Sequence, residues 1–87
     1  MFTMRDLVHT LAMTTDEMVI EDLLLGLTTK KERAEMLQRI EIVKRILKGD
    51  AHHRIAEDLG VGVATVTRGS KELANGRFKI FKEAEKC

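Results

Sequence analysis

Apolar side chains recur along this chain at the three- and four-residue spacing of helices, and threonine and glycine residues interrupt them. The first such run predicts a helix over residues 4–13. A second helix is expected to begin after Thr14 or Thr15, either of which can cap it, and Gly26 is a natural stop. Its apolar arc, drawn from residues 18–25, is too wide for the surface helix of a monomer. This helix is therefore expected either at the centre of the core or against a partner chain.

A longer helix is predicted over residues 30–48, where Thr29 and Glu32 have the spacing of a capping box. Its apolar residues follow one another at intervals of four, three and four, which places on one face Met36, Ile40, Val43 and Leu47. Gly49 can end this helix. The next element is expected to begin after Asp50, whose carboxylate can cap it.

Two short helices are predicted next, over residues 51–59 and 63–74, with a glycine-rich turn between them. Gly60 supplies the left-handed conformation that the turn of a helix-turn-helix requires, and the small Ala56 stands where the helices cross. The residues expected to face the core are Ile55, Ala56, Leu59, Val63, Val66 and Leu73. Small and polar residues on the outer face of the second helix suit a DNA major groove. A structural helical hairpin without DNA binding stays open as the alternative.

The composition favours one small all-helical domain over residues 1–87. The chain has no proline, 44% of its residues are hydrophobic and 33% are charged, which suits a folded protein rich in helix formers. Aromatic residues make up only 3% of the chain, which argues against the stacking surfaces of single-strand and RNA-binding folds. A chain of this size is marginally stable alone, so association with another chain is expected.

The formal net charge of +1 hides an uneven distribution. Residues 1–28 contain one base and five acids, for a net −4, and residues 29–87 contain 14 bases and nine acids, for a net +5. The basic surplus beside the two short helices favours a polyanionic partner such as double-stranded DNA. An ordinary solvated helical surface would also account for it.

The sequence does not indicate secretion, a membrane or a catalytic centre. Arg5 and Asp6 break the apolar stretch that a signal peptide needs, and the single cysteine, Cys87, excludes an intrachain disulfide. We therefore expect a cytoplasmic protein without membrane contact. The adjacent His52 and His53 cannot share a metal in the i, i+4 manner, and the sequence shows no nucleophile–base pair or carboxylate dyad. We expect neither a metal site nor an enzyme.

Two segments carry a resemblance to a known family, GVGVATVTRGSKEL and the preceding LTTKKERAEMLQRIEIVKRILKGD. Over residues 25–73 they resemble the bacterial tryptophan repressor family, and TRGS is quite specific. The resemblance implies an all-α, intertwined helical homodimer with a helix-turn-helix DNA-binding head in each chain. Residues 1–49 would form the dimerisation core, residues 50–75 the helix-turn-helix and residues 76–87 a short C-terminal helix. It also implies a transcriptional repressor that binds a palindromic operator, with L-tryptophan as corepressor.

The resemblance further implies a ligand site. Arg39 and Arg68 match the two arginines that flank the indole ring and bind the carboxylate, a role that suits a planar charged guanidinium. The other matching positions are a hydroxyl near the carboxylate, a glycine beside the ring and two backbone acceptors from the partner subunit, namely Thr28, Gly69, Leu25 and Leu27. Glu72 stands where the family has a serine near the ligand's amino group. It can pair with that ammonium or face solvent.

A DNA-facing surface is implied as well. The positions that match base-facing residues are Val63, Ala64 and Thr67. Thr65 and Arg68 match positions that contact phosphate or place the helix, and Lys71 can also reach a phosphate. His52 and His53 stand near where the family has serine and glutamine, so the phosphate contacts at the start of the head are expected to differ.

Three functions are consistent with these patterns. The first is a homodimeric repressor gated by a small aromatic ligand, expected to be L-tryptophan. The second is a DNA-binding dimer of the same fold that is ligand-independent or gated by another small molecule. The third is a helical protein-interaction module that does not bind DNA. Ligand-dependent DNA affinity separates the first from the second, and steep salt dependence on duplex DNA separates both from the third.

Overall fold

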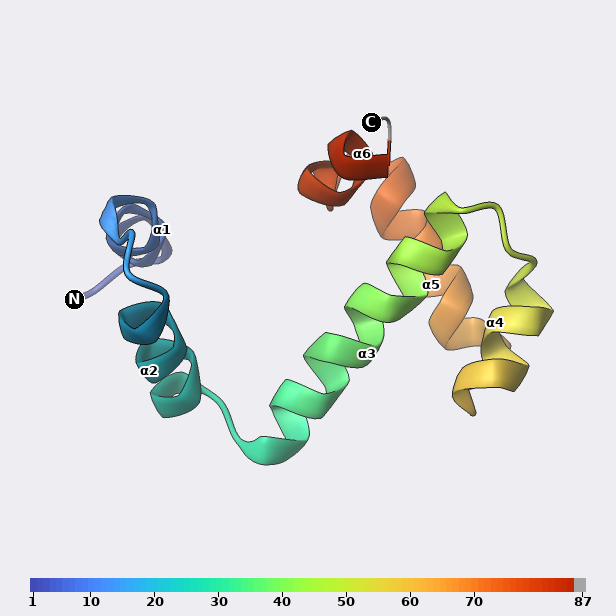
Figure 1. The fold of residues 1–87 in the computed structure, drawn as a ribbon, viewed down its shortest axis with the longest axis horizontal. Coiled ribbons are helices and arrows are strands. Elements are labelled where there is room, and N and C mark those ends of the chain that lie inside the picture. The colour runs from blue at the N-terminus through green and yellow to red at the C-terminus, as the bar shows by residue number, and fades with distance from the viewer. Residues whose placement is uncertain (86–87) are drawn as a thin grey trace. The chain divides into compact units, whose positions relative to one another are not determined.

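The computed structural model describes residues 1–85, with side chains as far as Lys82. This part of the chain contains six helices and no strand. In chain order they are α1 (Met4–Met13), α2 (Glu17–Leu27), α3 (Lys30–Leu47), α4 (His52–Leu59), α5 (Val63–Ala74) and α6 (Lys79–Glu85) (Figure 1). The all-α class is confirmed, and Cys87 lies outside the described residues. None of these six helices has the length and apolar character needed to cross a membrane.

The first of two compact units comprises residues 1–33, and its helices begin and end in local hydrogen bonds. The backbone N–H of Thr3 donates to the Asp6 carboxylate at 2.8 Å, and the backbone N–H of Asp6 donates to the Thr3 hydroxyl at 3.2 Å. Together they form a capping box for α1. The Thr3 backbone first, and its hydroxyl second, hold the pKa of Asp6 below its ordinary value of 3.8.

The start of α2 differs from the prediction by one or two residues. Asp16 is the capping residue, because its carboxylate accepts the backbone N–H of Met18 at 2.9 Å. The Thr14 hydroxyl instead donates to the carbonyl of Thr10 at 2.6 Å and so completes the end of α1. Aspartate is at least as good a cap as threonine, and here the threonine is already engaged.

The end of α2 also differs from the prediction, because Gly26 does not stop the helix. α2 continues to Leu27, and the Thr28 hydroxyl then donates to the carbonyl of Leu24 at 2.6 Å. Nη1 of Arg33, on the first turn of α3, donates to the Thr28 carbonyl at 2.7 Å. Because Gly26 lies inside the helix, the carbonyl groups at the end of α2 accept hydrogen bonds from these two polar side chains.

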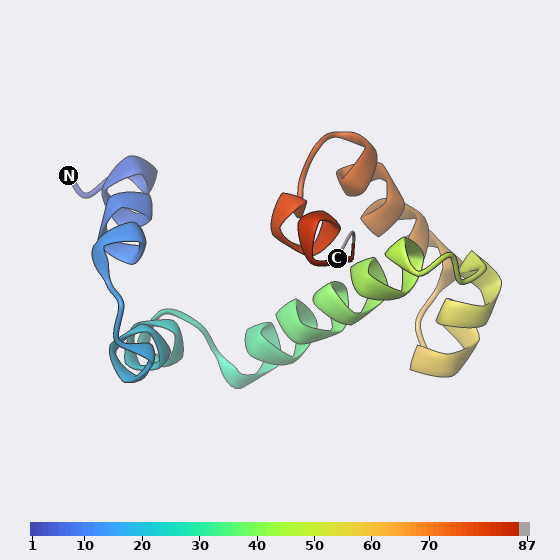
Figure 2. The same cartoon turned by 45° about the horizontal axis from the view of Figure 1, so that its top comes forward.

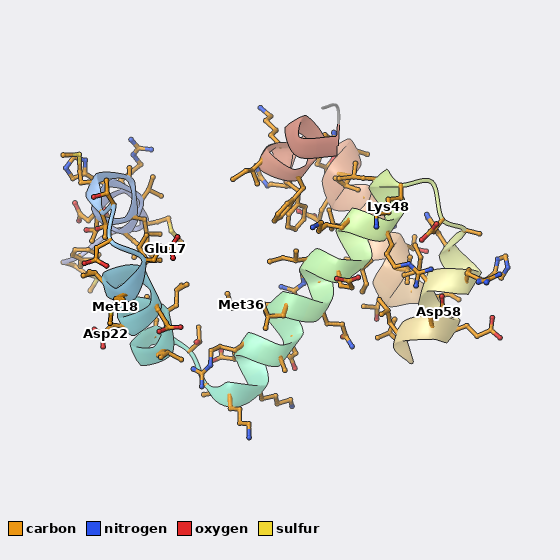
Figure 3. All side chains as sticks on the ribbon, viewed as in Figure 1. Glu17, Met18, Asp22, Met36, Lys48 and Asp58 are labelled. Carbon is orange, nitrogen blue, oxygen red and sulfur yellow. The ribbon has the colours of Figure 1, made fainter. Side chains whose placement is uncertain are left out.

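Most apolar side chains of α1 and α2 are exposed to solvent. No residue of Met4–Met13 or Glu17–Leu27 is buried, and Met18 (Figure 3) is 78% exposed. The expectation that the second helix occupies the centre of the core is therefore wrong for a single chain. The alternative, that it packs against a partner chain, stays a prediction.

The second unit, from Ala34 onward, contains the buried core. The core consists of Ile42, Ile55, Ala56 and Val66, against which pack Ile46, Leu59 and Val61. Figures 1 and 2 show α4 and α5 packed together across a short turn, where Gly60 takes the predicted left-handed conformation with φ 67°. Val63 was expected to face this core but is 52% exposed. It is the first residue of α5 and lies about 60° around the helix from Val66, on the edge next to the exposed Ala64.

A charged cluster fastens the end of α3 to α4. Nε of Arg45 donates to Oδ2 of Asp50 at 2.7 Å, and Nη1 lies 2.9 Å from Oδ2 of Asp58 on α4. Figure 3 labels Asp58. These contacts, first with Asp50 and then with Asp58, raise the pKa of Arg45. Asp50 is not the cap that its position predicts. Ala51 takes the cap position without a side-chain hydrogen bond, because the Asp50 carboxylate has a charged partner in Arg45.

Arg45→Gln is expected to lower the midpoint of thermal unfolding, because it leaves Asp50 and Asp58 without their shared cation. Circular dichroism at low and high salt measures the shift, which should shrink as salt screens the charges. The control is Lys48→Gln, which removes the same charge from an exposed position just beyond α3 (Figure 3). Equal midpoints for the two variants would contradict a stabilising role for the cluster.

Candidate functional site

A cavity of about 430 Å³ lies in the second unit, with walls from α3, α5 and the turn that leads to α6. Its lining consists of Arg39, Ile42, Thr65, Arg68, Gly69, Glu72, Arg77 and Phe78. The four residues from α5 follow the three- and four-residue spacing that places them on one side of a helix. The volume falls within the range of small-molecule sites, roughly 300–1,000 Å³.

Part of the predicted ligand site comes together in this cavity. The predicted residues that line it are Arg39, Arg68, Gly69 and Glu72. The other predicted residues, Leu25, Leu27 and Thr28, belong to the first unit at the end of α2. There the hydroxyl and the carbonyl of Thr28 both accept from Arg33. The ligand roles of these three residues stay predictions.

Gly69 lets α5 approach α3 closely. A Cβ atom on Gly69 would lie 3.2 Å from Cγ2 of Ile42 and 3.8 Å from Cγ2 of Val43. The first of these distances is tighter than an ordinary van der Waals contact, and Ile42 and Val43 are themselves buried. The family resemblance implies a glycine beside the ligand ring. The structure shows that the same glycine also sets the packing of α5 on the core.

Arg77 and Phe78 also line the cavity, although neither is among the predicted site residues. Gly76 has φ 87° and Phe78 has φ 59°, and both belong to the turn between α5 and α6. In the sequence, Gly76 was the available sign of this turn, because it indicates where α5 ends. A phenylalanine in the left-handed backbone conformation costs about 1–3 kcal/mol, and the residue type does not predict it.

Two contacts hold this turn. The rings of Phe78 and Phe81 stack with their centroids 6.3 Å apart. Nζ of Lys82 donates to the carbonyl of Leu73 at 3.0 Å, which ties α6 to the last turn of α5. The strained backbone at Phe78 is therefore supported from α6.

The charges around the cavity are unequal. Three guanidinium groups and one carboxylate occur among its described lining residues, on Arg39, Arg68, Arg77 and Glu72. Ile42 and Phe78 add apolar surface. Guanidinium groups pair with carboxylates and stack on aromatic rings, so the cavity suits a small ligand that carries both. No group of three or more histidine, cysteine, aspartate and glutamate residues in the described part of the chain can hold a metal ion.

The residues of α5 fall on three sides of the helix. The residues buried in the second unit are Val66, Gly69 and Leu73. The other residues along the cavity are Thr65, Arg68 and Glu72. The outward side consists of the exposed Val63, Ala64 and Lys71 and the half-buried Thr67. At about 100° per residue, Arg68 stands between the outward side and the cavity, whereas Thr65 lies almost opposite Val63. The structure thus places Thr65 in the cavity wall, and its predicted contact with DNA stays a prediction.

His52 and His53 form the first turn of α4, where His52 is half-buried and His53 is exposed. His53 borders a shallow hollow that also includes Arg45 and Arg54. Both histidines are on the helix that packs against α5, as predicted, and their contact with DNA phosphate is untested.

The fold and the site define a small all-α protein in which one helix, α5, lines a ligand-sized cavity and also presents an exposed side. The chain belongs to the Trp repressor protein family, whose model matches residues 3–84. It is 40% identical over 83 residues to a Trp operon repressor homolog of Vibrio parahaemolyticus, which covers 94% of this chain and 76% of the relative.

Two other relatives match this chain over fewer residues but with higher identity. A Trp operon repressor homolog of Vibrio vulnificus is 50% identical over 52 residues, or 59% of this chain and 51% of the relative. One of Vibrio cholerae is 48% identical over 54 residues, or 61% of this chain and 52% of the relative. The chain thus spans about half the length of these two relatives. No solved structure gives a significant match.

Gly69→Val is expected to lower the free energy of unfolding by about 1–3 kcal/mol, because its methyl groups meet Ile42 and Val43. Urea denaturation measures the change. The control is Ala64→Val on the same helix, which adds two methyl groups at an exposed position. It is expected to change stability by less than about 1 kcal/mol, the difference in helix propensity. An undiminished stability of Gly69→Val would contradict the close contact of α5 with α3.

Proposed function

We propose that this chain is a DNA-binding transcriptional repressor that acts as a homodimer, and that L-tryptophan raises its affinity for DNA. The observation that carries the proposal is the double use of α5, with Arg68 between the cavity side and the outward side. A ligand in the cavity would touch the helix that meets DNA. The naming of the Vibrio relatives as Trp operon repressor homologs supports the same function.

The outward side of α5 has the size and chemistry of a helix that reads a major groove. The exposed Val63 and Ala64 are small enough to let the helix approach the base edges. Thr67 and Lys71, one and two turns further along, can donate hydrogen bonds to bases and phosphates. α4, the left-handed Gly60 and α5 together have the order of a helix-turn-helix. The net +5 of residues 29–87 favours a polyanion.

The cavity has the chemistry of a site for a small aromatic amino acid. Arg39 and Arg68 reach it from α3 and α5, so two guanidinium groups can hold a carboxylate or stack on an indole ring. Ile42 and Phe78 supply the apolar wall that an indole requires. This combination supports L-tryptophan as the corepressor.

The exposed apolar side chains of the first unit support a homodimer. Four apolar residues of α2 are more than half exposed, namely Met18, Val19, Leu25 and Leu27. A small chain rarely leaves so much apolar surface in water unless another molecule covers it. A second copy of the chain is the occupant that we propose, in agreement with the resemblance.

The purified protein is expected to bind a palindromic duplex, selected from a random-sequence library, whose half-site centres are about 34 Å apart or a multiple of that. L-tryptophan should raise the affinity at least tenfold in gel-shift titrations, and 200 mM salt should weaken it strongly relative to 50 mM. Binding that ignores tryptophan would remove it as corepressor and leave a dimer gated in another way. Binding to no duplex at either salt concentration would contradict the repressor function.

Arg39→Ala is expected to lower the affinity for L-tryptophan at least tenfold without loss of helicity, because the cavity loses a guanidinium group. Ligand fluorescence measures binding directly, since the chain contains no tryptophan. Lys44→Ala is the control, an exposed cation on the same helix outside the cavity lining. An affinity equal to the wild type in Arg39→Ala would place the ligand elsewhere.

A further inference from the structure

Arg45 connects α3 to the two parts of the chain that follow it through a single guanidinium group. Its Nε donates to Oδ2 of Asp50 at 2.7 Å, in the segment before α4, and its Nη1 lies 2.9 Å from Oδ2 of Asp58, near the end of α4. The Arg45 carbonyl also accepts the backbone N–H of Asp50 at 3.1 Å. Because a guanidinium is planar and its N–H donors point in fixed directions, it holds the two carboxylates in a defined arrangement.

Arg45 is the anchor of this cluster. Its side chain is 19% exposed, whereas those of Asp50 and Asp58 are 35% and 45% exposed. A second cation, Arg54, has its Nε 3.9 Å from the same Oδ2 of Asp58, but its side chain is 70% exposed. Water and salt weaken a pair that is so open. The more buried Arg45 therefore sets the position of the Asp58 carboxylate.

Asp58 lies where the helix-turn-helix changes direction. It is the second-last residue of α4 and stands two residues before the left-handed Gly60. The backbone N–H of Val61 then donates to the carbonyl of Ala56 at 3.0 Å, which closes the turn. The pair with Arg45 therefore holds the end of α4 from which the chain continues into α5.

The start of α4 borders the same cluster. His53 is exposed and lines a shallow hollow together with Arg45, Asp50 and Asp58. His53 is also a predicted contact of the head with DNA phosphate. A shift of the cluster would therefore move both the first turn of α4 and the turn that leads into α5.

We propose that Arg45 and Asp58 are positioning residues for DNA recognition, because their ion pair fixes α4 on the end of α3 and so sets the direction in which α5 meets the base edges. The inference rests on the proposed function, since it requires that α5 reads duplex DNA. Base contacts depend on direction, whereas attraction to phosphates acts on any sequence. The pair therefore supports the preference for one sequence and not the general affinity for DNA.

The charge of Asp58 separates this role from simple electrostatics. A carboxylate on a DNA-binding head repels phosphates, so its loss should by charge alone raise the affinity for every duplex. The loss of a positioning residue should instead lower the affinity for the preferred sequence. Partial unfolding differs from both, because it lowers the apparent affinity for all duplexes by one factor, the folded fraction.

The test is the ratio of two affinities, measured by gel shift with L-tryptophan present and at one salt concentration. One duplex is the palindrome selected with the wild type, and the other has the same bases in scrambled order. In Asp58→Asn the affinity for the palindrome should fall about fivefold, the bias that a half-exposed ion pair can supply. The affinity for the scrambled duplex should stay equal or rise.

The matched control is Glu57→Gln, which removes the same charge from the neighbouring exposed position of α4, outside the lining of the hollow. This variant should keep the wild-type ratio of the two affinities. An equal fall of the ratio in Glu57→Gln and Asp58→Asn would mean that charge alone acts, and it would overturn the inference.

A double-mutant cycle assigns the effect to the pair. Arg45→Gln is expected to lower the ratio by about the same factor as Asp58→Asn, roughly fivefold. In the double variant the ratio should fall no further than in either single variant, because residues that act through one contact are not additive. Two independent, additive effects would contradict the positioning role of the pair.

The failure of this inference is distinguishable from the failure of the proposed function. An Asp58→Asn variant that keeps the wild-type ratio would overturn the inference alone. A wild type that binds both duplexes equally would overturn sequence-specific DNA binding, and the inference with it. Circular dichroism at the assay temperature verifies the fold of each variant. If Asp58→Asn does not fold, the ratio in Arg45→Gln decides, and an unchanged ratio there would overturn the inference.

Discussion

The close approach of α5 to α3 is the constraint on which the second unit depends. An added Cβ on Gly69 would lie only 3.2 Å from Cγ2 of Ile42 and in contact with Val43, two of the least exposed residues described. Ile42 belongs both to the buried core and to the cavity wall. The distance between the two helices therefore sets the packing of the core and the width of the cavity together. Stability and ligand recognition cannot be adjusted separately at this position.

The pair formed by α4 and α5 has two different attachments to α3. One is apolar, at Gly69 and Ile42, and the other is ionic, through Arg45 and Asp58. The pair cannot turn about one attachment without disturbing the other. Arg68 lies at the edge of α5 that borders both the cavity and the outward side, so the position of its side chain affects both surfaces.

Local capping chemistry made most helix ends predictable to within one or two residues, and the errors arose where a polar side chain bonds to a different nearby partner. Gly60 adopts the predicted left-handed turn, because glycine does so at little cost. Asp50 was expected to cap α4, yet it pairs with Arg45, which precedes it by five residues across the end of α3. In the cavity, the family resemblance identified positions on α3 and α5 but neither Arg77 nor Phe78. No rule of residue type predicts a left-handed phenylalanine or the direction in which it turns the chain.

The hydrogen-bonded ends of α1 and α2 contrast with the lack of any buried residue in Met4–Met13 and Glu17–Leu27. Caps determine where a helix begins and ends, but tertiary packing supplies most of the free energy that keeps a helix in place. In the proposed homodimer, that free energy comes from the second copy that covers Met18, Leu25 and their neighbours. Such covering would follow mass action, so the ordered fraction of the first unit would rise with the concentration of the chain. The proposed dimer would thereby couple the abundance of the chain to its own folding equilibrium.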